Sequence, residues 1–350
     1  MQFIRRLLKR EAPPGRLRGS TAGRAVASVA AAAALALPLA GALMPATAAH
    51  AADEKVQEGG TLNVILQPEP PILILGLNQQ APTQLVAGKI YEGLLRYDHD
   101  LNPIPGLAKS WEISDDGLTY TFHLQEGVTW HDGEPFTAKD VVFSTTKFLP
   151  EVHPRARANF SHVEKVTAPD DHTVVFKLKQ PFPAFILAFE VSSAPMMPAH
   201  IYEGTDYRNN PKNDTPIGTG PFQYDKWVKG SYVHLVKYKN YWQKGKPHLD
   251  DIYFRIIPDA ASRALALETG DVDVSQYGNI EPFDVQRLAA MPHLRMTTKG
   301  YEFVSPMSWI EINHREKPLG DKRFRQAIMY ALDREFIRDN IFFGLGRVAT

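Results

Sequence analysis

Short runs of apolar residues, separated by clusters of Pro, Gly, Asp and Asn, make up most of the chain after residue 60. The first run, Thr61–Leu66, predicts a strand that is buried on both faces. It ends at Gln67–Pro71, where three prolines lack the N–H group that a strand ladder requires. Apolar residues at near-helical spacing then predict a helix over residues 81–95.

Two pairs of alternating runs flank turn sequences and predict antiparallel hairpins. Residues 110–113 and 118–124 lie on either side of Asp115-Asp116-Gly117. Residues 165–167 and 173–178 lie on either side of a turn at 169–172. Asp-Gly between alternating runs is a strong hairpin signal because it tolerates the backbone angles of a tight turn.

Thr137 has the sequence context of a helix N-cap. Asp140 lies three positions later, which resembles a capping box, and Phe136 and Val141 are placed for a hydrophobic staple. We therefore predict a helix from Thr137 to about Leu149.

The remaining elements complete a mixed pattern of strands and helices. Residues 181–220 are rich in proline and predict loops, with Pro216–Pro221 as a tight crossover of the chain. Further strands are predicted at 222–227, 232–238, 252–257, 272–274 and 309–313, and further helices at 262–269, 280–291, 322–332 and from Asp333 to near Gly344. This succession indicates an α/β fold with several antiparallel hairpins.

The first 51 residues have the composition of a secretory signal peptide. The part before Ala25 holds seven basic residues and one acidic residue, and an uncharged stretch from Ala25 to Leu43 follows. Ala49-His50-Ala51 fits a cleavage site with small residues at both ends. We expect cleavage near Ala52.

Two alternatives concern this leader. The uncharged stretch is long enough for a membrane anchor, but its Ala and Gly content and the small residues after it favour cleavage. Arg5-Arg6 followed by Lys9 is compatible with a twin-arginine export signal and equally with an ordinary basic leader.

Charge and cysteine content exclude several classes of function. Residues 52–350 carry 32 Lys and Arg against 38 Asp and Glu, a net charge of −6, which gives no reason to expect nucleic acid or anionic lipid as a partner. The chain has no cysteine, so disulfides, Cys-ligated metals and thiol nucleophiles are excluded. It also lacks the cysteine that tethers a bacterial lipoprotein, so we expect the periplasm of a Gram-negative cell.

Residues that resemble catalytic or ligand motifs have simpler interpretations. His131 and Asp132 are adjacent, so on a strand they point apart, and the Gly133 that follows indicates a turn. The twelve histidines form no H-E-x-x-H motif and no i,i+4 pair, so no zinc site is predicted. Gly218-Thr219-Gly220 lacks the lysine and the following helix of a nucleotide loop.

Several ordered blocks resemble the signature of the family 5 extracellular solute-binding proteins, which serve ABC transporters for dipeptides, oligopeptides and nickel. The blocks are Pro103–Trp111, Ser114–Phe122, Gly127–Gly133 and Pro135–Ser144, supported by Tyr91–Leu95, Gly218–Phe222, Ala266–Asp273 and Phe324–Arg334. They cover nearly all of the chain after the leader. Physically they are turns and a capped helix, so they indicate the fold and leave the ligand open.

The resemblance implies a two-lobed periplasmic-binding-protein fold of class II. Residues 52–300 would form lobe I, with an inserted subdomain of hairpins and a helix at about 96–200, and residues 301–350 would begin lobe II. Family members continue well beyond the point equivalent to Thr350, so the second lobe is expected to be incomplete here. We therefore expect no micromolar peptide binding by this chain, and exposure of a C-terminal apolar cluster, namely Phe336, Ile337, Ile341, Phe342 and Phe343.

The function that the resemblance implies is capture of a small solute by lobe closure and delivery to ABC permease subunits, by a monomer without a cofactor or a catalytic residue. Di- or oligopeptides are the expected ligands, while nickel chelates, haem, opines and sugars remain alternatives. A chaperone or chemoreceptor on the same fold is a second hypothesis. A periplasmic hydrolase is a third, although no G-x-S-x-G or metal motif is present.

Five residues are candidates for the ligand site: Gln67, Glu69, Pro70, Asn78 and Trp309. Glu69 lies in the loop after the first strand, where α/β sheets bind ligands, and it is placed to meet a cationic group. A proline-stiffened surface loop explains this segment equally well. Trp309 suits a cleft for varied side chains, but a core tryptophan is at least as good an interpretation.

Overall fold

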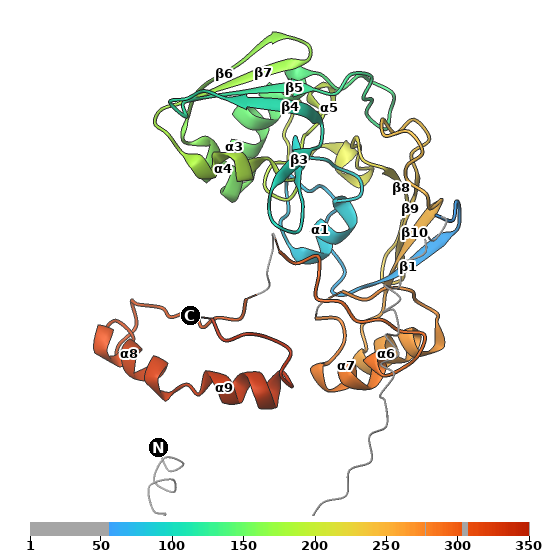
Figure 1. Ribbon diagram of the computed structural model, residues 1–350, viewed down its shortest axis with the longest axis vertical. Helices are drawn as coiled ribbons and strands as arrows, with labels where there is room; N and C mark the ends of the chain where they lie inside the picture. Colours follow the sequence, from blue (N-terminus) through green and yellow to red (C-terminus); the bar gives the residue numbers. More distant parts are fainter. Residues whose placement is uncertain (1–55, 277, 303–306, 350) are drawn as a thin grey trace, which may run out of the picture. The chain divides into compact units, whose positions relative to one another are not determined.

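The structure is a computed structural model that describes residues 56–276, 278–302 and 307–349. Within these ranges it contains two four-stranded sheets and one two-stranded sheet, together with short helices (Figure 1). The predicted leader, residues 1–51, lies outside the described residues. Among the described residues, no helix has the length and apolar character needed to cross a membrane.

The first sheet has the strand order β1-β10-β9-β8. Its strands are β1 (Thr61–Leu66), β10 (Asp251–Ile256), β9 (Tyr232–Lys237) and β8 (Phe222–Val228). Strand β1 runs parallel to β10, with Leu66 paired to Ile256, whereas β9 is antiparallel to both of its neighbours. A parallel bridge between Val64 and Val274 extends this sheet on the other side of β1. The predicted strands at these positions are confirmed, and the 272–274 segment contributes only this bridge.

The second sheet has the order β4-β5-β7-β6 and is antiparallel throughout. It consists of β4 (Ala108–Ile113), β5 (Thr119–Leu124), β7 (Thr173–Leu178) and β6 (Val163–Asp170), and a small ladder joins β2 (Leu95–Tyr97) to β3 (Pro103–Pro105). Both predicted hairpins are therefore confirmed. In the first turn, Asp116 Oδ1 accepts the Leu118 N–H at 2.9 Å, as expected for an aspartate that stabilises a turn.

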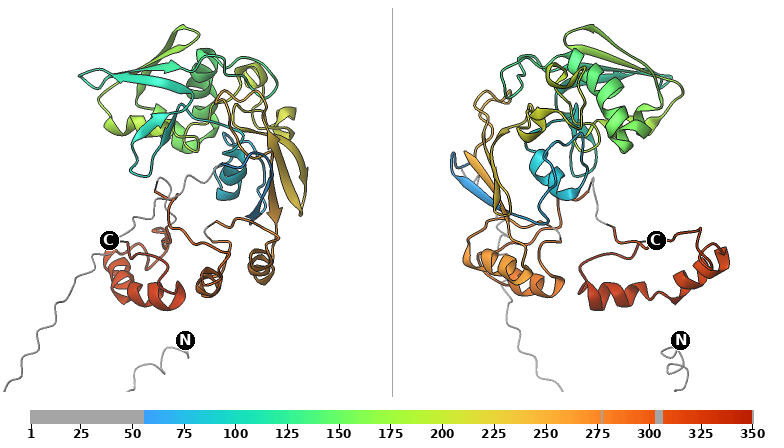
Figure 2. Two further views of the ribbon diagram at one scale, coloured as in Figure 1. Left: turned by 45° about the vertical axis from the view of Figure 1, so that its right-hand side comes forward. Right: turned by 180° about the vertical axis from the view of Figure 1, so that it is seen from behind.

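The helices are short; α1 to α5 lie between strands along the chain, and α6 to α9 follow the last strand. They are α1 (Ala81–Ala87), α2 (Ala138–Phe143), α3 (Leu149–Val152), α4 (Pro154–Phe160), α5 (Ala199–Tyr202), α6 (Ala260–Thr269), α7 (Pro282–Ala289), α8 (Lys322–Ala331) and α9 (Arg334–Phe336). Helix α2 packs against β6 and β7, and α6 packs against α7 (Figure 2). The predicted helix from Thr137 to Leu149 is a short α-helix that continues as a π-helical stretch, Ser144–Phe148, before α3 begins.

Two sequence predictions are wrong in their extent or type. The helix predicted over 81–95 ends at Ala87, because the Lys89 and Ile90 carbonyls accept hydrogen bonds from Phe222 and Gly220 (3.2 and 2.8 Å) instead of from a following helical turn. The segment 309–313 is not a strand, since no described strand pairs with it.

The two sheets contribute to one continuous hydrophobic core. Aromatic side chains dominate its centre under the second sheet, where Phe122, Phe176, Phe185 and Phe189 make mutual ring contacts at 4.5–5.8 Å. A smaller core forms where the fully buried Ile65 of β1 meets α6 and α7. The first sheet is thus anchored on both faces near the end of β1.

Gly218 and Gly220 allow the crossover segment to lie directly against the chain after α1. A Cβ at Gly218 would be 1.9 Å from the Ile90 carbonyl oxygen, and one at Gly220 would be 2.5 Å from the Lys89 carbonyl oxygen. No side chain fits at such distances, so these two glycines serve close backbone approach. The predicted crossover is confirmed as a packing feature of the fold.

The described residues 307–349 contain no buried residue. Phe336, Ile341 and Phe343 are exposed, as predicted, at 55%, 57% and 42%. Ile337 and Phe342 are half-buried. The expected apolar exposure is therefore confirmed at three of the five named positions.

The start of α2 provides a test of the capping interpretation. Asp140 is buried, and its carboxylate accepts the backbone N–H groups of Thr137 (3.0 Å) and Ala199 (2.9 Å). Thr137→Ala should lower the free energy of unfolding by about 1 kcal/mol, the usual value of an N-cap. Asp140→Ala should cost more, about 2–3 kcal/mol, because it leaves two buried donors without an acceptor. Urea denaturation of both variants checks this order, and an equal loss in both would contradict it.

Candidate ligand-binding site

Parallel strands bring several loops to one edge of the first sheet. Strands β1 and β10 run the same way, and so does the chain at Val274, so the segments 67–70, 257–259 and 275–276 leave the sheet on one side. The β8–β9 turn joins them, since the Ile256 N–H donates to the Ser231 carbonyl at 2.8 Å. We call these segments the carboxyl edge. Open α/β sheets bind ligands at this edge because the strand ends leave a crevice between diverging loops.

Glu69 lies at the carboxyl edge and is hydrogen-bonded within the protein. Its Oε1 accepts the indole N–H of Trp227 at 2.9 Å, and both carboxylate oxygens lie 3.1 Å from the Gly230 N–H. Lys229 places its ammonium 3.0 Å from the centre of the Trp227 ring. Glu69 therefore holds the β8–β9 turn in place, and its predicted contact with a cationic ligand stays a prediction.

Lys229 adds a positive charge to the same edge. Burial lowers the pKa of its ammonium, while the nearby carboxylates of Glu69 and Asp214 raise it. A cation beside a carboxylate suits a ligand that carries both charges, as the termini of a peptide do.

The other candidate residues differ in position. Gln67 is half-buried and Pro70 is buried at the carboxyl edge beside Glu69. Asn78 lies just before α1, and its Oδ1 accepts the Gln80 N–H at 2.9 Å, which fixes the turn into that helix. Trp309 is 68% exposed, and its indole N–H donates to Glu311 at 3.2 Å. The structure thus brings together the three candidates between residues 67 and 70.

Two buried polar side chains that sequence reasoning missed shape the carboxyl edge. Arg263 of α6 is 6% exposed and donates to the carbonyls of Ile257 (3.1 Å) and Pro258 (2.6 Å). Asn279 is 1% exposed and donates from Nδ2 to the Ile65 carbonyl at 3.2 Å. Both satisfy loop carbonyls that would otherwise be buried without a donor. The sequence feature that could have identified Arg263 is an arginine directly before the apolar run Ala264–Leu267.

Glu92 is a third residue that the sequence analysis did not single out. Its carboxylate accepts from Tyr241 (2.8 Å), Trp242 (3.1 Å) and Thr219 (3.1 Å). Burial raises the pKa of Glu92 to about 7, against the lowering effects of these three donors and of Arg96. The sequence feature that could have identified Glu92 is an acidic residue within the apolar run Ile90–Leu95. Glu92 connects the chain after α1 to the crossover and to the segment after β9.

His131 and Asp132 point to different partners, which confirms the turn interpretation. The Gly218 N–H donates to His131 Nδ1 at 3.3 Å, and His131 Nε2 lies 2.9 Å from the Gly220 carbonyl. Because a carbonyl only accepts, Nε2 carries the proton and the ring is neutral. Burial accordingly lowers the pKa of His131 to about 4. Asp132 pairs instead with His200, at 2.8 Å.

In the part of the chain that the structure describes, no group of three or more His, Cys, Asp or Glu side chains is arranged to hold a metal ion. The polar groups of the carboxyl edge are amides, serine hydroxyls, backbone groups, the carboxylates of Glu69 and Asp259, and the ammonium of Lys229. Such groups bind by hydrogen bonds and charge, and none of them is paired as a nucleophile with a base.

Comparison with known families decides the class of protein. Residues 102–350 match the family model described as bacterial extracellular solute-binding proteins, family 5 Middle. The chain belongs to this family. The architecture is therefore that of the two-lobed solute-binding proteins. It combines a mixed sheet, in which β1 and β10 are parallel, with a second, antiparallel sheet, and the α/β fold prediction is confirmed.

Individual relatives show the range within the family. The chain is 32% identical over 275 residues to the glutathione-binding protein GsiB of Salmonella typhi. It is similar to the oligopeptide-binding protein AppA of Bacillus subtilis, solved with a nonapeptide (27% identity, TM-score 0.72, covering 84% of this chain and 58% of that one). It is also similar to AgaA of A. tumefacien R10, solved with agropinic acid (30% identity, TM-score 0.70, covering 82% and 57%).

The alignment with GsiB covers 77% of this chain and 51% of that protein, so the chain spans about half the length of the relatives it matches. Family 5 is a family of binding proteins. The lobe boundaries at residues 52–300, 96–200 and 301–350 stay predictions, as do the ligand contacts of Gln67, Glu69, Pro70, Asn78 and Trp309.

Proposed function

We propose that this protein is the solute-binding component of an ABC importer and captures a peptide or a similar small solute at its carboxyl edge. The observation that carries the proposal is the convergence of four loops on the ends of β1 and β10, with Glu69 and Lys229 side by side. A carboxylate and an ammonium at one edge complement a zwitterionic ligand. One relative is named as a glutathione-binding protein, and two others were solved with a nonapeptide and with agropinic acid. These ligands support the proposal of a small ligand with a carboxylate group.

The importer role determines location and partners. We propose that the protein acts in the periplasm after removal of residues 1–51, as a monomer that delivers its ligand to permease subunits. The basic, apolar and small-residue succession of the leader supports export. N-terminal sequencing of the periplasmic protein should begin near Ala52, whereas an intact Met1 in the membrane fraction would contradict cleavage.

Methyl NMR of the full chain tests the binding site. Titration with glutathione, with Met-Leu and with a nonapeptide, each to millimolar concentration, should shift the methyl signals of Leu66, Ile72 and Ile257 in a saturable way. These side chains lie at or beside the carboxyl edge. Val174, which is fully buried in the second sheet, serves as the internal control and should not shift.

Absence of saturable shifts with all three probes would contradict the proposal, and so would shifts confined to the second sheet. Release of amino acids from either peptide during the titration would instead favour the hydrolase alternative.

A further inference from the structure

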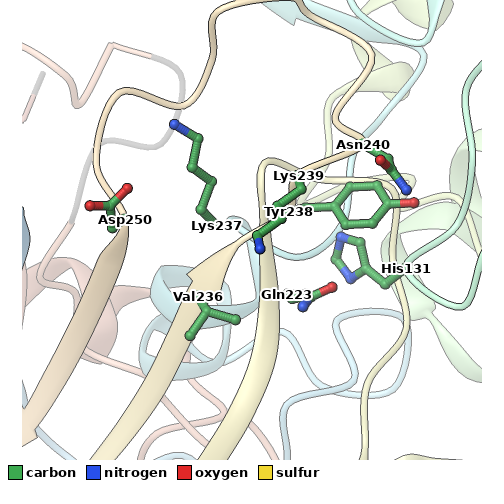
Figure 3. Close-up of a pocket in the computed structure, with 8 residues that line it drawn as sticks. All are labelled: His131, Gln223, Val236, Lys237, Tyr238, Lys239, Asn240 and Asp250. Carbon is green, nitrogen blue, oxygen red and sulfur yellow. The ribbon is translucent and has the colours of Figure 1, made fainter. Parts of the chain in front are cut away.

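A pocket of about 610 Å³ lies at the edge of the first sheet opposite the carboxyl edge. Strand β9 ends there, where Val236 pairs with Asp251 at the start of β10, and Lys237 pairs with Phe222 at the start of β8. Its lining comes from both sheet and loop: His131, Gln223, Val236, Lys237, Tyr238, Lys239, Asn240 and Asp250 (Figure 3). Nothing in the proposed import function uses this pocket.

One wall of the pocket is held rigidly by Tyr238. This residue is 5% exposed, its hydroxyl donates to the Trp130 carbonyl (2.9 Å) and lies 2.7 Å from the Thr129 hydroxyl, and its N–H donates to the Pro221 carbonyl (2.9 Å). The ring packs against His131, with 4.8 Å between the centroids. The bonds of Tyr241 and Trp242 to Glu92 fix the chain just beyond. The lysines on either side of Tyr238 therefore start from a fixed backbone.

Four polar side chains of the pocket have no partner among the described residues. The side chains of Lys237, Lys239, Gln223 and Asn240 make no hydrogen bond or ion pair in the described ranges, and those of Lys239 and Asn240 are exposed. The one acid of the lining, Asp250, accepts the Gly60 N–H at 3.2 Å. Figure 3 shows Lys237 and Lys239 between Asp250 on one side and Tyr238 with His131 on the other. Both lysines thus line one concave surface, and no carboxylate of the described residues lies within ion-pair distance of either ammonium group.

We propose that this pocket is a second binding site, for a small organic anion with a carboxylate group and a short apolar body. The ammonium groups of Lys237 and Lys239 hold the carboxylate, and the amides of Gln223 and Asn240 donate hydrogen bonds to it. The apolar body lies over Val236 and the methylene stems of the lysines, which present hydrocarbon beneath their charges. Inorganic anions share the charge but lack the apolar body, so they are expected to bind more weakly.

Calorimetric titration of the full chain with hexanoate tests this site, with inorganic phosphate and acetate as comparison probes. Hexanoate should bind saturably, more tightly than either comparison probe, and more weakly at high salt because the lysines are screened. The double variant K237Q/K239Q should weaken hexanoate binding at least tenfold. Lys226→Gln, which removes the same charge from the exposed part of β8 outside the pocket, should leave it unchanged.

A third variant separates charge from apolar contact. Val236→Ala should weaken hexanoate binding severalfold without changing acetate binding. The proposal is wrong if the natural chain shows no saturable hexanoate binding, if Lys226→Gln weakens binding as much as the double variant, or if phosphate binds more tightly than hexanoate. Thermal unfolding of each variant shows whether it is folded, and methyl signals at Leu66 and Ile72 should stay unshifted by hexanoate, which keeps this site separate from the carboxyl edge.

Discussion

Glu92→Leu should lower the free energy of unfolding by about 3 kcal/mol at pH 5. Leucine has a similar volume but accepts no hydrogen bond, so the Trp242 indole N–H and the hydroxyls of Tyr241 and Thr219 lose their shared acceptor. A buried donor left without a partner costs about 1–3 kcal/mol. The indole N–H cannot rotate toward another acceptor as a hydroxyl can, so it accounts for much of the loss. Urea denaturation followed by tryptophan fluorescence measures the change.

Glu126→Leu is the matched control for this substitution. Glu126 is exposed and pairs with Lys109 at 2.7 Å on the surface, so its loss should change stability by about 0.5 kcal/mol or less. Equal losses in Glu92→Leu and Glu126→Leu would show that the three bonds to Glu92 do not stabilise the fold.

Glu92→Gln separates the charge of Glu92 from its hydrogen bonds. Burial raises the pKa of Glu92 to about 7 in the folded chain, above its ordinary value of 4.5, so the folded state binds this proton more tightly than the unfolded state. The stability that results is fully present below about pH 4.5 and is lost as pH rises through 7. Glutamine does not titrate. The difference in stability between the two proteins should therefore move in favour of Glu92→Gln from pH 5 to pH 8, and a constant difference would contradict the raised pKa.

Local turn chemistry explains why much of the fold could be predicted from the sequence. The β4–β5 hairpin depends on Asp116 and Gly117, which act on residues only two or three positions away. The helix predicted over 81–95 failed for the opposite reason. Its apolar spacing is real, since Ile90 and Leu94 are fully buried, but Ile90 packs against the crossover at Gly218–Gly220, and sequence spacing alone does not reveal such a partner.

The site was less predictable because its hydrogen bonds join distant segments. Asn279 bonds to the Ile65 carbonyl across 214 positions, and Thr219 bonds to Glu92 across 127. Glu69 could be selected because it follows a strand end directly, which is a local feature. Its bonds to Trp227 and Gly230 span 158 and 161 positions, so its role in holding the β8–β9 turn became visible only in the structure.

Below pH 6.5 the chain should lose stability through two neutral histidines, the half-buried His131 and the buried His153, and His153 gives the clearer test. His153 is fully buried; the Ala156 N–H donates to its Nδ1 at 3.1 Å, and its Nε2 lies 3.2 Å from the Ser192 carbonyl. As in His131, the carbonyl requires the proton on Nε2, and Nδ1 must stay unprotonated to cap α4. Burial lowers the pKa of His153 to about 4, so the unfolded chain binds this proton more tightly than the folded one.

The contribution of His153 is therefore present above about pH 6.5 and is lost as pH falls through 4, with a total of roughly 3 kcal/mol because one pKa unit corresponds to about 1.4 kcal/mol. The stability contributed by His153 is lost as pH falls, whereas that contributed by Glu92 is lost as pH rises. One series of pH values therefore separates the two groups. His153→Asn keeps a capping oxygen for α4 but gains no proton, so natural and variant stabilities should converge between pH 6.5 and pH 4. The exposed His314→Asn is the control and should keep a constant difference. Parallel curves for the natural chain and His153→Asn would mean that protonation of His153 does not oppose folding.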